Sequence, residues 1–363
     1  MKVAIIGTRG VPANYGGFET FAEELGRRLA ERGHEVTVYG RRGFVDPSLG
    51  RYRGMDLVVL PSIRTKHLET VSNTLVSALH AAVARYDVVL MCNAANAPFI
   101  PILRWTGIPV AINVDGLERK RRKWGAVGRA YYRLGEQLSA LLPNRLITDA
   151  RVIQRYYRRF YRRSSIMIAY GGDLEPPSTT ETLDRLGLEA DGYVLYVSRF
   201  EPENNPDRVV EAWTRVAGKR RLVMVGGAPY AVDLTRRVHE LADERVVLPG
   251  TVYGDGYREL LFNCRAYIHA TEVGGTHPAL VEAMGAGRPV LYYDTPENRE
   301  VASGAGLGFR FSGSAALETR LNELLDDDAQ LEELGERSRA RVADRYRWSS
   351  VADAYEEVLQ SLC

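Results

Sequence analysis

Glycine and polar residues follow a short apolar run near the N-terminus, where they could bind a phosphate. After Val3–Ile6 the chain reads Gly7-Thr8-Arg9-Gly10-Val11-Pro12, and Gly16 and Gly17 open a predicted helix. Unobstructed backbone N–H groups at the positive end of a helix suit an anion. The spacing departs from the dinucleotide pattern G-x-G-x-x-G, because Arg9 and Pro12 stand at its second and third glycine positions. A phosphate site and a long structural turn are both compatible with this segment.

A second glycine turn lies in the segment Thr271–Met284 and precedes a helix that opens with Pro278. The backbone N–H groups of Gly274, Gly275 and Thr276 could hold a phosphate or a sugar. On the helix, the carboxylate of Glu282 could accept both hydroxyls of a ribose. The alternative for Glu282 is a solvated or salt-bridged surface residue.

Two further charged residues follow apolar runs. Arg199 stands after Tyr193–Val197 and could form a bidentate contact with a diphosphate, or else a surface salt bridge. Asp115 ends another apolar run and could bind a hydroxyl of an acceptor, or else form a local turn.

The elements that must position these residues alternate between short apolar strands and amphipathic helices. This alternation predicts an α/β protein with parallel, doubly wound sheets, in which ligands bind at the carboxyl ends of the strands. A helix is predicted from about Phe18 to Arg32. The strands are predicted near Val3–Ile6, Glu35–Tyr39, Leu57–Leu60, Val88–Met91, Val110–Asn113, Leu146–Thr148, Tyr193–Val197, Arg221–Val225, Arg245–Leu248, Ala266–Ala270 and Pro289–Tyr292.

The length of 363 residues suits two domains. The segment Gly171–Thr180 interrupts the regular pattern. We therefore predict domains at residues 1–172 and 173–345, both Rossmann-like, with a cleft between them. Residues 346–363 are predicted to form an amphipathic helix that packs back on the first domain.

Composition predicts an ordinary soluble, cytoplasmic protein. Three cysteines without a C-x-x-C pair favour neither a disulfide framework nor a zinc site, and no apolar run is long enough to span a membrane. We expect no cofactor and no metal ion.

Charge is divided unevenly along the chain. Residues 1–170 contain 27 Lys and Arg against 13 Asp and Glu, whereas the remainder contains 21 against 33. The first half is therefore suited to an anionic partner, for which nucleic acid, an anionic membrane and a diphosphate-linked substrate are candidates. Two stretches concentrate the positive charge, Arg119–Lys123 and Arg151–Arg163, and aromatic residues accompany both. Each is either a membrane-binding segment or a solvated helix face.

Taken together, the glycine turns resemble those of family four of the retaining glycosyltransferases, and within it the bacterial polysaccharide rhamnosyltransferases. The resemblance extends over nearly the whole chain. The segments that carry it are Gly7–Pro12, Tyr15–Thr20, Asn113–Glu118, Ser198–Asn205 and Val273–Met284.

This resemblance implies the GT-B fold and the transfer of a sugar from a nucleotide-sugar donor. It implies that Gly16 and Gly17 approach the donor phosphate, that Arg199 neutralises the diphosphate and that Glu282 binds the ribose. It also implies that Gly250, Thr251 and Val252 surround the base. Gly274, Gly275 and Thr276 complete the expected donor site.

The resemblance implies that Asp115 lies at the acceptor site, at a position where relatives often carry histidine. We expect Asn93 and Glu19 to bind the acceptor as well. Catalytic roles are expected for Asp115, Arg199 and Glu282. The expected acceptor is a saccharide or a lipid-diphosphate-linked saccharide, on the inner face of the cell membrane, with an anionic membrane surface as a further partner. We expect no nucleic-acid partner.

Two departures from the family bear on the donor. Asn204 stands where the family usually carries a lysine, which leaves Arg9 as a candidate for the missing charge. Gly274 stands where the family carries a glutamate that holds sugar hydroxyls, and Glu272 is displaced from that position by two residues. A 6-deoxy sugar fits such a pocket, so dTDP-L-rhamnose is the expected donor. The alternatives are a UDP- or GDP-sugar transferase, a sugar-nucleotide epimerase of the same fold, and a non-catalytic scaffold that binds anionic surfaces.

Overall fold

The computed structural model describes residues 1–363 except for residue 15, residues 66–67 and residues 228–230. The described residues form two compact units. Unit 1 comprises Met1–Lys120, Trp124–Tyr170 and Trp348–Cys363, and unit 2 comprises Arg121–Lys123 and Gly171–Arg347. The sequence prediction placed Arg121–Lys123 in the first domain, whereas their contacts group them with unit 2.

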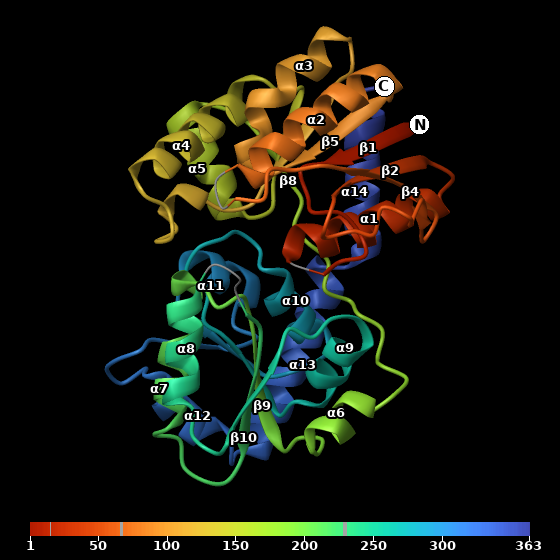
Figure 1. The fold of residues 1–363 in the computed structure, drawn as a ribbon. Coiled ribbons are helices and arrows are strands. Elements are labelled where there is room, and N and C mark those ends of the chain that lie inside the picture. The colour runs from red at the N-terminus through yellow and green to blue at the C-terminus, as the bar shows by residue number, and fades with distance from the viewer. Residues whose placement is uncertain (15, 66–67, 228–230) are drawn as a thin grey trace. The chain divides into compact units, whose positions relative to one another are not determined.

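Unit 1 is built on one twisted sheet whose described strands lie in the order β3-β4-β2-β1-β5-β6-β7-β8 (Figure 1). All neighbouring strands are parallel except β3 and β4. The central strands are buried along nearly their whole length, as expected where helices cover both faces. The strands are β1 (Lys2–Ile6), β2 (Glu35–Arg41), β3 (Arg51–Tyr52), β4 (Met55–Leu60), β5 (Val88–Cys92), β6 (Val110–Val114), β7 (Arg145–Thr148) and β8 (Ile166–Met167).

The C-terminal helix of the chain completes the core of unit 1. α14 lies beside α1 (Figure 1), and the rings of Phe21 and Tyr355 are 5.1 Å apart. Arg32 pairs with Asp353 and Glu356 at 2.6 Å each. The helices of this unit are α1 (Gly17–Glu31), α2 (Glu69–Ala84), α3 (Ile100–Trp105), α4 (Ala126–Leu141), α5 (Arg151–Tyr161) and α14 (Trp348–Gln360), with the 3-10 helices η1 (Ala94–Phe99) and η2 (Glu118–Lys120).

Unit 2 is built on a second sheet, in which the described strands are all parallel and lie in the order β11-β10-β9-β12-β13-β14. Its strands are β9 (Tyr193–Val197), β10 (Arg221–Val225), β11 (Val246–Gly250), β12 (Ala266–His269), β13 (Val290–Tyr293) and β14 (Leu307–Phe309). Its helices are α6 (Glu181–Leu186), α7 (Pro206–Trp213), α8 (Val232–Leu241), α9 (Gly254–Asn263), α10 (Pro278–Gly285), α11 (Pro296–Ala302), α12 (Leu317–Leu324) and α13 (Asp328–Arg345), with the 3-10 helix η3 (Pro202–Asn204).

The two sheets confirm the prediction of two doubly wound, Rossmann-like α/β folds. In each unit the chain winds outward from a central strand, returns and winds outward on the other side. The strand order therefore reverses between β1 and β5 in unit 1, and between β9 and β12 in unit 2. Such a reversal leaves a crevice beyond the carboxyl ends of the two strands, where ligands of doubly wound sheets bind. Among the described residues, no helix is both long and apolar enough to cross a membrane.

Candidate donor and acceptor sites

In unit 2, the loops that follow β9 and β12 flank the reversal of strand order. They contain Ser198–Asn205 and the glycine turn that leads to α10, the same two segments that the sequence singled out. The backbone joins them directly, because the amide of Glu272 donates to the carbonyl of Glu203 at 2.8 Å. The topology thus brings Arg199 and the turn Gly274–Thr276 to the same end of the sheet, beyond the carboxyl ends of β9 and β12.

Asn204, at the position where a lysine was expected, holds the first of these loops together. The side-chain amide of Asn204 donates to the carbonyl of Arg199 at 2.7 Å. The backbone carbonyl of Asn204 accepts a hydrogen bond from the hydroxyl of Tyr196 at 2.8 Å. Asn204 is buried. This residue therefore fixes the course of the backbone at Arg199 rather than offering a charge to a ligand.

In the second loop, the space beside Gly274 is filled by a side chain. A Cβ atom built on Gly274 would lie 2.2 Å from Cε1 of His277, so the imidazole of His277 occupies the space beside this glycine. His277 is also the residue that precedes the first turn of α10. A side chain at position 274 would clash with this ring unless His277 moved, so the group beside the glycine is an imidazole.

The two histidines of this loop region are uncharged near neutral pH. The rings of His269 and His277 lie 4.7 Å apart. Burial lowers the pKa of His269 to about 3. Burial, followed by the neighbouring His269, Arg121 and Arg199, holds the pKa of His277 well below its ordinary value. The side of the loop near Gly274 is therefore polar but neutral.

Glu272 is held away from the position of the missing glutamate by two partners. Its Oε1 accepts a hydrogen bond from the amide of Asn205 at 3.0 Å, and its Oε2 pairs with Arg122 at 2.5 Å. For Glu272 to replace the missing carboxylate, both contacts would have to break. The local structure thus favours a donor pocket without a carboxylate at this point.

Glu282 lies on α10 and is 5% exposed. The hydroxyl of Tyr257, on α9, donates to its Oε2 at 2.7 Å. Burial raises the pKa of Tyr257 well above its ordinary value, and the charge of Glu282 raises it further. Tyr257 therefore stays protonated, donates to Glu282 and orients the carboxylate that we expect to bind a ribose.

The three residues expected around the base follow the end of β11. Gly250 is the last residue of that strand and has a φ of 79°, a conformation that favours glycine. Gly250 and Thr251 are exposed, and Val252 is partly buried. They are accessible to a ligand.

Four cations of the basic stretch 119–123 form ion pairs, namely Arg119, Arg121, Arg122 and Lys123. Within unit 2, Arg121 pairs with Glu203 at 3.1 Å, and both side chains are buried. Lys123 pairs with Glu201 at 3.3 Å. With the pair between Arg122 and Glu272, these contacts place three consecutive cations on carboxylates of the two loops.

In unit 1, the loops after β1 and β5 flank the reversal of strand order. Gly16 precedes the first turn of α1 without a side-chain cap, and Gly17 is the first residue of that helix. Glu19 is buried, and its Oε1 accepts from the amide of Arg9 at 2.8 Å. The guanidinium of Arg9 lies 3.5 Å from Glu69. Glu19 therefore shapes the glycine loop; its contact with an acceptor stays a prediction, and residue 15 of the same motif lies outside the described residues.

The other two residues expected on the acceptor side lie after neighbouring strands. Asn93 follows β5 and caps η1, because its Oδ1 accepts from the amide of Ala95 at 2.9 Å. Asp115 follows β6 and is partly buried. The expected site residues thus form two groups, one at the ligand-binding end of each unit.

Two models of known protein families match the chain. The model for "Glycosyltransferase Family 4" matches residues 15–172, and the model for "Glycosyl transferases group 1" matches residues 179–341. Both models describe glycosyltransferases and together they cover most of the chain, so the chain is a glycosyltransferase. The two family models meet near the boundary between the two units.

Solved structures of this glycosyltransferase fold align over almost the full chain. Sucrose-phosphate synthase from Thermosynechococcus elongatus is 19% identical and has a TM-score of 0.82, covering 99% of this chain and 98% of that one. The Anabaena protein Alr3699/HepE, in complex with UDP and glucose, is 15% identical and has a TM-score of 0.78, covering 99% and 100%. These likenesses confirm the GT-B fold.

One curated relative is similar in sequence over part of the chain. It is the gpi3 subunit of phosphatidylinositol N-acetylglucosaminyltransferase from Schizosaccharomyces pombe, 26% identical over 176 residues, or 47% of this glycosyltransferase. The match spans 38% of the length of that relative.

Sequence reasoning missed several residues that shape the sites. Tyr257 contacts Glu282, and the ring of His269 lies against that of His277, yet neither residue belongs to a glycine turn or a charged motif. The spacing of His277 three residues after Gly274 was visible in the sequence, but only the folded loop shows that its ring covers the glycine.

Proposed function

We propose that this glycosyltransferase moves L-rhamnose from dTDP-L-rhamnose to a saccharide acceptor, with retention of configuration, in bacterial polysaccharide synthesis. The observation that carries the proposal is the neutral imidazole beside Gly274. A pocket built to bind a sugar hydroxyl with a carboxylate would leave that carboxylate unpaired against a methyl group. A neutral wall avoids this cost and is compatible with a 6-deoxy sugar.

The proposed donor site keeps the residues expected from the sequence. Glu282, oriented by Tyr257, binds the ribose, and Gly250, Thr251 and Val252 surround the base. Arg199 and the backbone N–H groups of Gly274, Gly275 and Thr276 bind the diphosphate, and Gly16 and Gly17 approach its phosphate. Arg9 is the proposed additional cation, although its contact with Glu69 would have to rearrange.

The proposed mechanism relies on electrostatic stabilisation and positioning. The bond between the anomeric carbon and the diphosphate oxygen breaks while the acceptor hydroxyl attacks on the same face of the sugar. The departing oxygen takes the proton of that hydroxyl. Arg199 and helix N-termini stabilise the charge that develops on the leaving group, so no metal ion or cofactor is required in this proposal. Asp115 binds the acceptor, with Asn93 and Glu19 nearby, and holds it for attack.

The proposed acceptor is a saccharide on a lipid diphosphate, at the inner face of the cell membrane. The excess of positive charge in residues 1–170 supports an anionic acceptor or surface. A UDP-hexose transferase is the second candidate, because the similar Alr3699/HepE structure holds UDP and glucose.

An acceptor-dependence assay tests the proposal. Release of dTDP from dTDP-L-rhamnose should require a lipid-diphosphate-linked saccharide. An epimerase would instead alter the donor without any acceptor, and a scaffold would neither bind nor turn over the donor. Either result would contradict the proposal.

Site variants sharpen the same experiment. Arg199→Ala should weaken binding of dTDP by about 1.5–3 kcal/mol, the range for hydrogen bonds to charged groups, and Glu282→Ala should weaken binding of the whole nucleotide. Arg236→Ala and Glu240→Ala, both exposed on α8, are matched controls that should bind as the wild type does. Unchanged calorimetric affinity in both site variants would place the donor elsewhere.

A further inference from the structure

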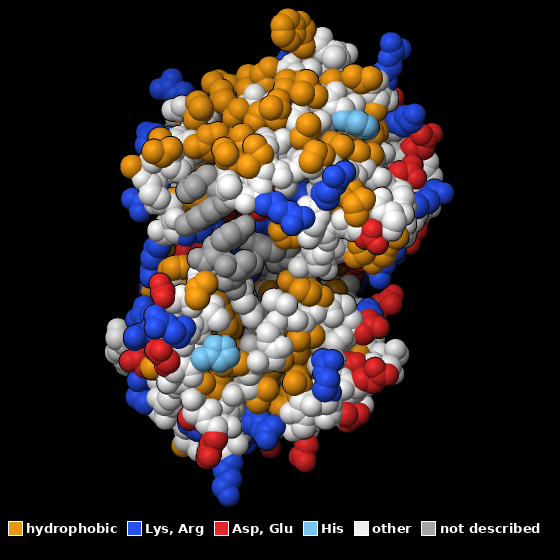
Figure 2. Space-filling view, viewed as in Figure 1, with side chains coloured by type: hydrophobic (Ala, Val, Ile, Leu, Met, Phe, Trp, Pro, Cys, Tyr) orange, Lys and Arg blue, Asp and Glu red, His pale blue; other side chains and the backbone are white. Residues whose placement is uncertain are grey.

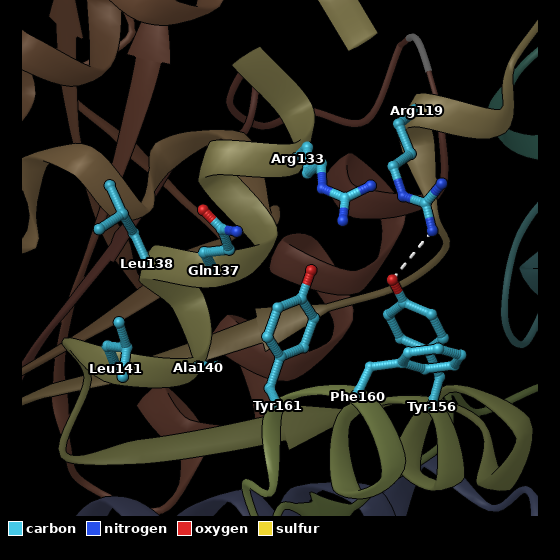
Figure 3. A pocket seen from close by; sticks show the side chains of 9 residues that line it. All are labelled: Arg119, Arg133, Gln137, Leu138, Ala140, Leu141, Tyr156, Phe160 and Tyr161. Carbon is cyan, nitrogen blue, oxygen red and sulfur yellow. Dashed lines mark hydrogen bonds between the residues drawn. The ribbon is translucent and has the colours of Figure 1, made fainter. Parts of the chain in front are cut away.

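A pocket lies between α4 and α5 of unit 1, formed within that unit alone. Its volume is about 510 Å³. It is lined by residues of η2, α4 and α5, namely Arg119, Arg133, Gln137, Leu138, Ala140, Leu141, Tyr156, Phe160 and Tyr161. In Figure 3 the guanidinium groups of Arg119 and Arg133 lie on the same side of the pocket, facing the rings of Tyr156, Phe160 and Tyr161.

A buried carboxylate next to the pocket is already neutralised. Oε2 of Glu136 accepts from Nε of Arg119 at 3.1 Å and from the hydroxyls of Tyr156 and Tyr161 at 3.0 and 3.2 Å. Arg119 also donates to the hydroxyl of Tyr156 at 2.9 Å. This network fixes the aromatic rings and cancels the charge of Arg119 with that of Glu136. Arg133 therefore contributes the net positive charge of the pocket.

The helices around the pocket have a large excess of cations. α4 and α5 contain six arginines, and Glu136 is their one acidic residue. Within the part of the chain that the structure describes, Arg133, Arg155 and Arg158 form no ion pair. The positive charge of this face is therefore complementary to an anion.

The opposite lip of the pocket is apolar and exposed. Leu141 is 72% exposed and Phe160 63% exposed, and Val127, on the same helix as Leu141, is also exposed. Figure 2 shows that hydrophobic side chains gather on the face of unit 1 where α2, α3 and α4 lie. Leu79 of α2 and Trp105 of α3 are exposed. Large exposed apolar areas of this kind mark binding surfaces.

We propose that the α4–α5 pocket binds the phosphate headgroup of an anionic membrane lipid while Leu141 and Phe160 enter the interface of the bilayer. Arg133 contacts the headgroup phosphate, and the arginines of α5 lie over the anionic surface. Cations beside exposed apolar residues, without exposed acids, suit the headgroup region of a membrane.

A second copy of this chain fits the same surface poorly. A two-fold interface would bring the arginines of one α4–α5 face against those of the other, and like charges repel each other. A water-soluble phosphate would satisfy Arg133 but would leave Leu141 and Phe160 exposed. The combination of features favours a lipid. This inference is independent of which sugar the enzyme transfers.

Sedimentation of the full chain with vesicles tests the proposal. The wild type should bind vesicles of phosphatidylglycerol and phosphatidylcholine at low salt, and bind phosphatidylcholine vesicles much more weakly. Arg133→Gln should weaken binding by about fivefold, the effect of one cation near an anionic surface. Phe160→Ser should weaken it as well. Matched changes on α8 of unit 2, Arg236→Gln and Val232→Ser, should leave binding unchanged, because both residues are exposed far along the sequence from the pocket.

Four results would overturn the proposal. Equal binding to both kinds of vesicle would show that the lipid charge does not matter. Pocket variants that bind like the α8 controls would place the membrane contact elsewhere. Inorganic phosphate that binds the chain while vesicles do not, or a dimer that Phe160→Ser dissociates while vesicles do not bind, would identify a different occupant. Circular dichroism checks that each variant is folded, and donor turnover with a water-soluble acceptor reports separately on the proposed function.

Discussion

The two basic stretches of this glycosyltransferase look alike in sequence and differ in structure. In the first stretch, residues 119–123, four cations pair with carboxylates: Arg119 with Glu136, Arg121 with Glu203, Arg122 with Glu272 and Lys123 with Glu201. In the second, α5, the arginines at 155, 158 and 159 form no ion pair with any residue that the structure describes. Among the described residues, Arg155, Arg158 and Arg159 are therefore available to an external anion.

This difference shows that the role of a charged run depends on its partners in the fold. The partners of the first stretch include Glu203 and Glu272, which lie 82 and 150 residues from their arginines. No local pattern reveals such pairs. In the second stretch, alternating arginines and aromatic residues form a helix that exposes both kinds of side chain. Replacing single arginines by glutamine, one in each environment, tests the contrast.

The largest effect on stability is expected for Arg121→Gln. Glu203 is fully buried, and its Oε2 has no hydrogen-bond partner among the described residues. Removing the arginine leaves a buried charge without compensation, which typically costs about 3–5 kcal/mol. Unfolding by urea measures the loss. A decrease below about 1 kcal/mol would show that this pair resembles a surface ion pair.

Much smaller effects are expected for Arg122→Gln and Arg158→Gln. The side chain of Arg122 is 53% exposed, so its pair with Glu272 should contribute at most about 1 kcal/mol. Arg158 has no ion-pair partner to lose among the described residues, and its replacement should change the free energy of unfolding by less than about 0.5 kcal/mol. The same urea titrations check both. A cost for Arg158→Gln as large as that for Arg121→Gln would remove the distinction between the two stretches.

The sequence predicted most of the fold because apolar runs and helical periodicity carry the signal for buried elements. The long strands and α1 lie within a few residues of their predicted bounds. β3, β8 and β14 were missed. Each contains only two or three residues, too few to show a pattern, and each lies at or near the edge of its sheet.

The site was less predictable than the fold. The topology determines which loops lie together, but side-chain contacts within the folded loops determine what each residue does. Strand order brings the loops after β9 and β12 together, and alternating elements are enough to predict this. The filling of the space beside Gly274 by His277, and the retention of Glu272 by Asn205, depend on the folded loops. The same holds for Asn204, whose contact with the carbonyl of Arg199 gives it a structural role.

Competition between two donors tests the proposed function most directly. The purified enzyme is given dTDP-L-rhamnose and UDP-glucose with the same lipid-diphosphate-linked acceptor, and kcat/KM is measured for each. The neutral wall beside Gly274 predicts the higher specificity constant for dTDP-L-rhamnose, because no charged carboxylate is left unpaired against the methyl group. A higher specificity constant for UDP-glucose would contradict the rhamnose assignment.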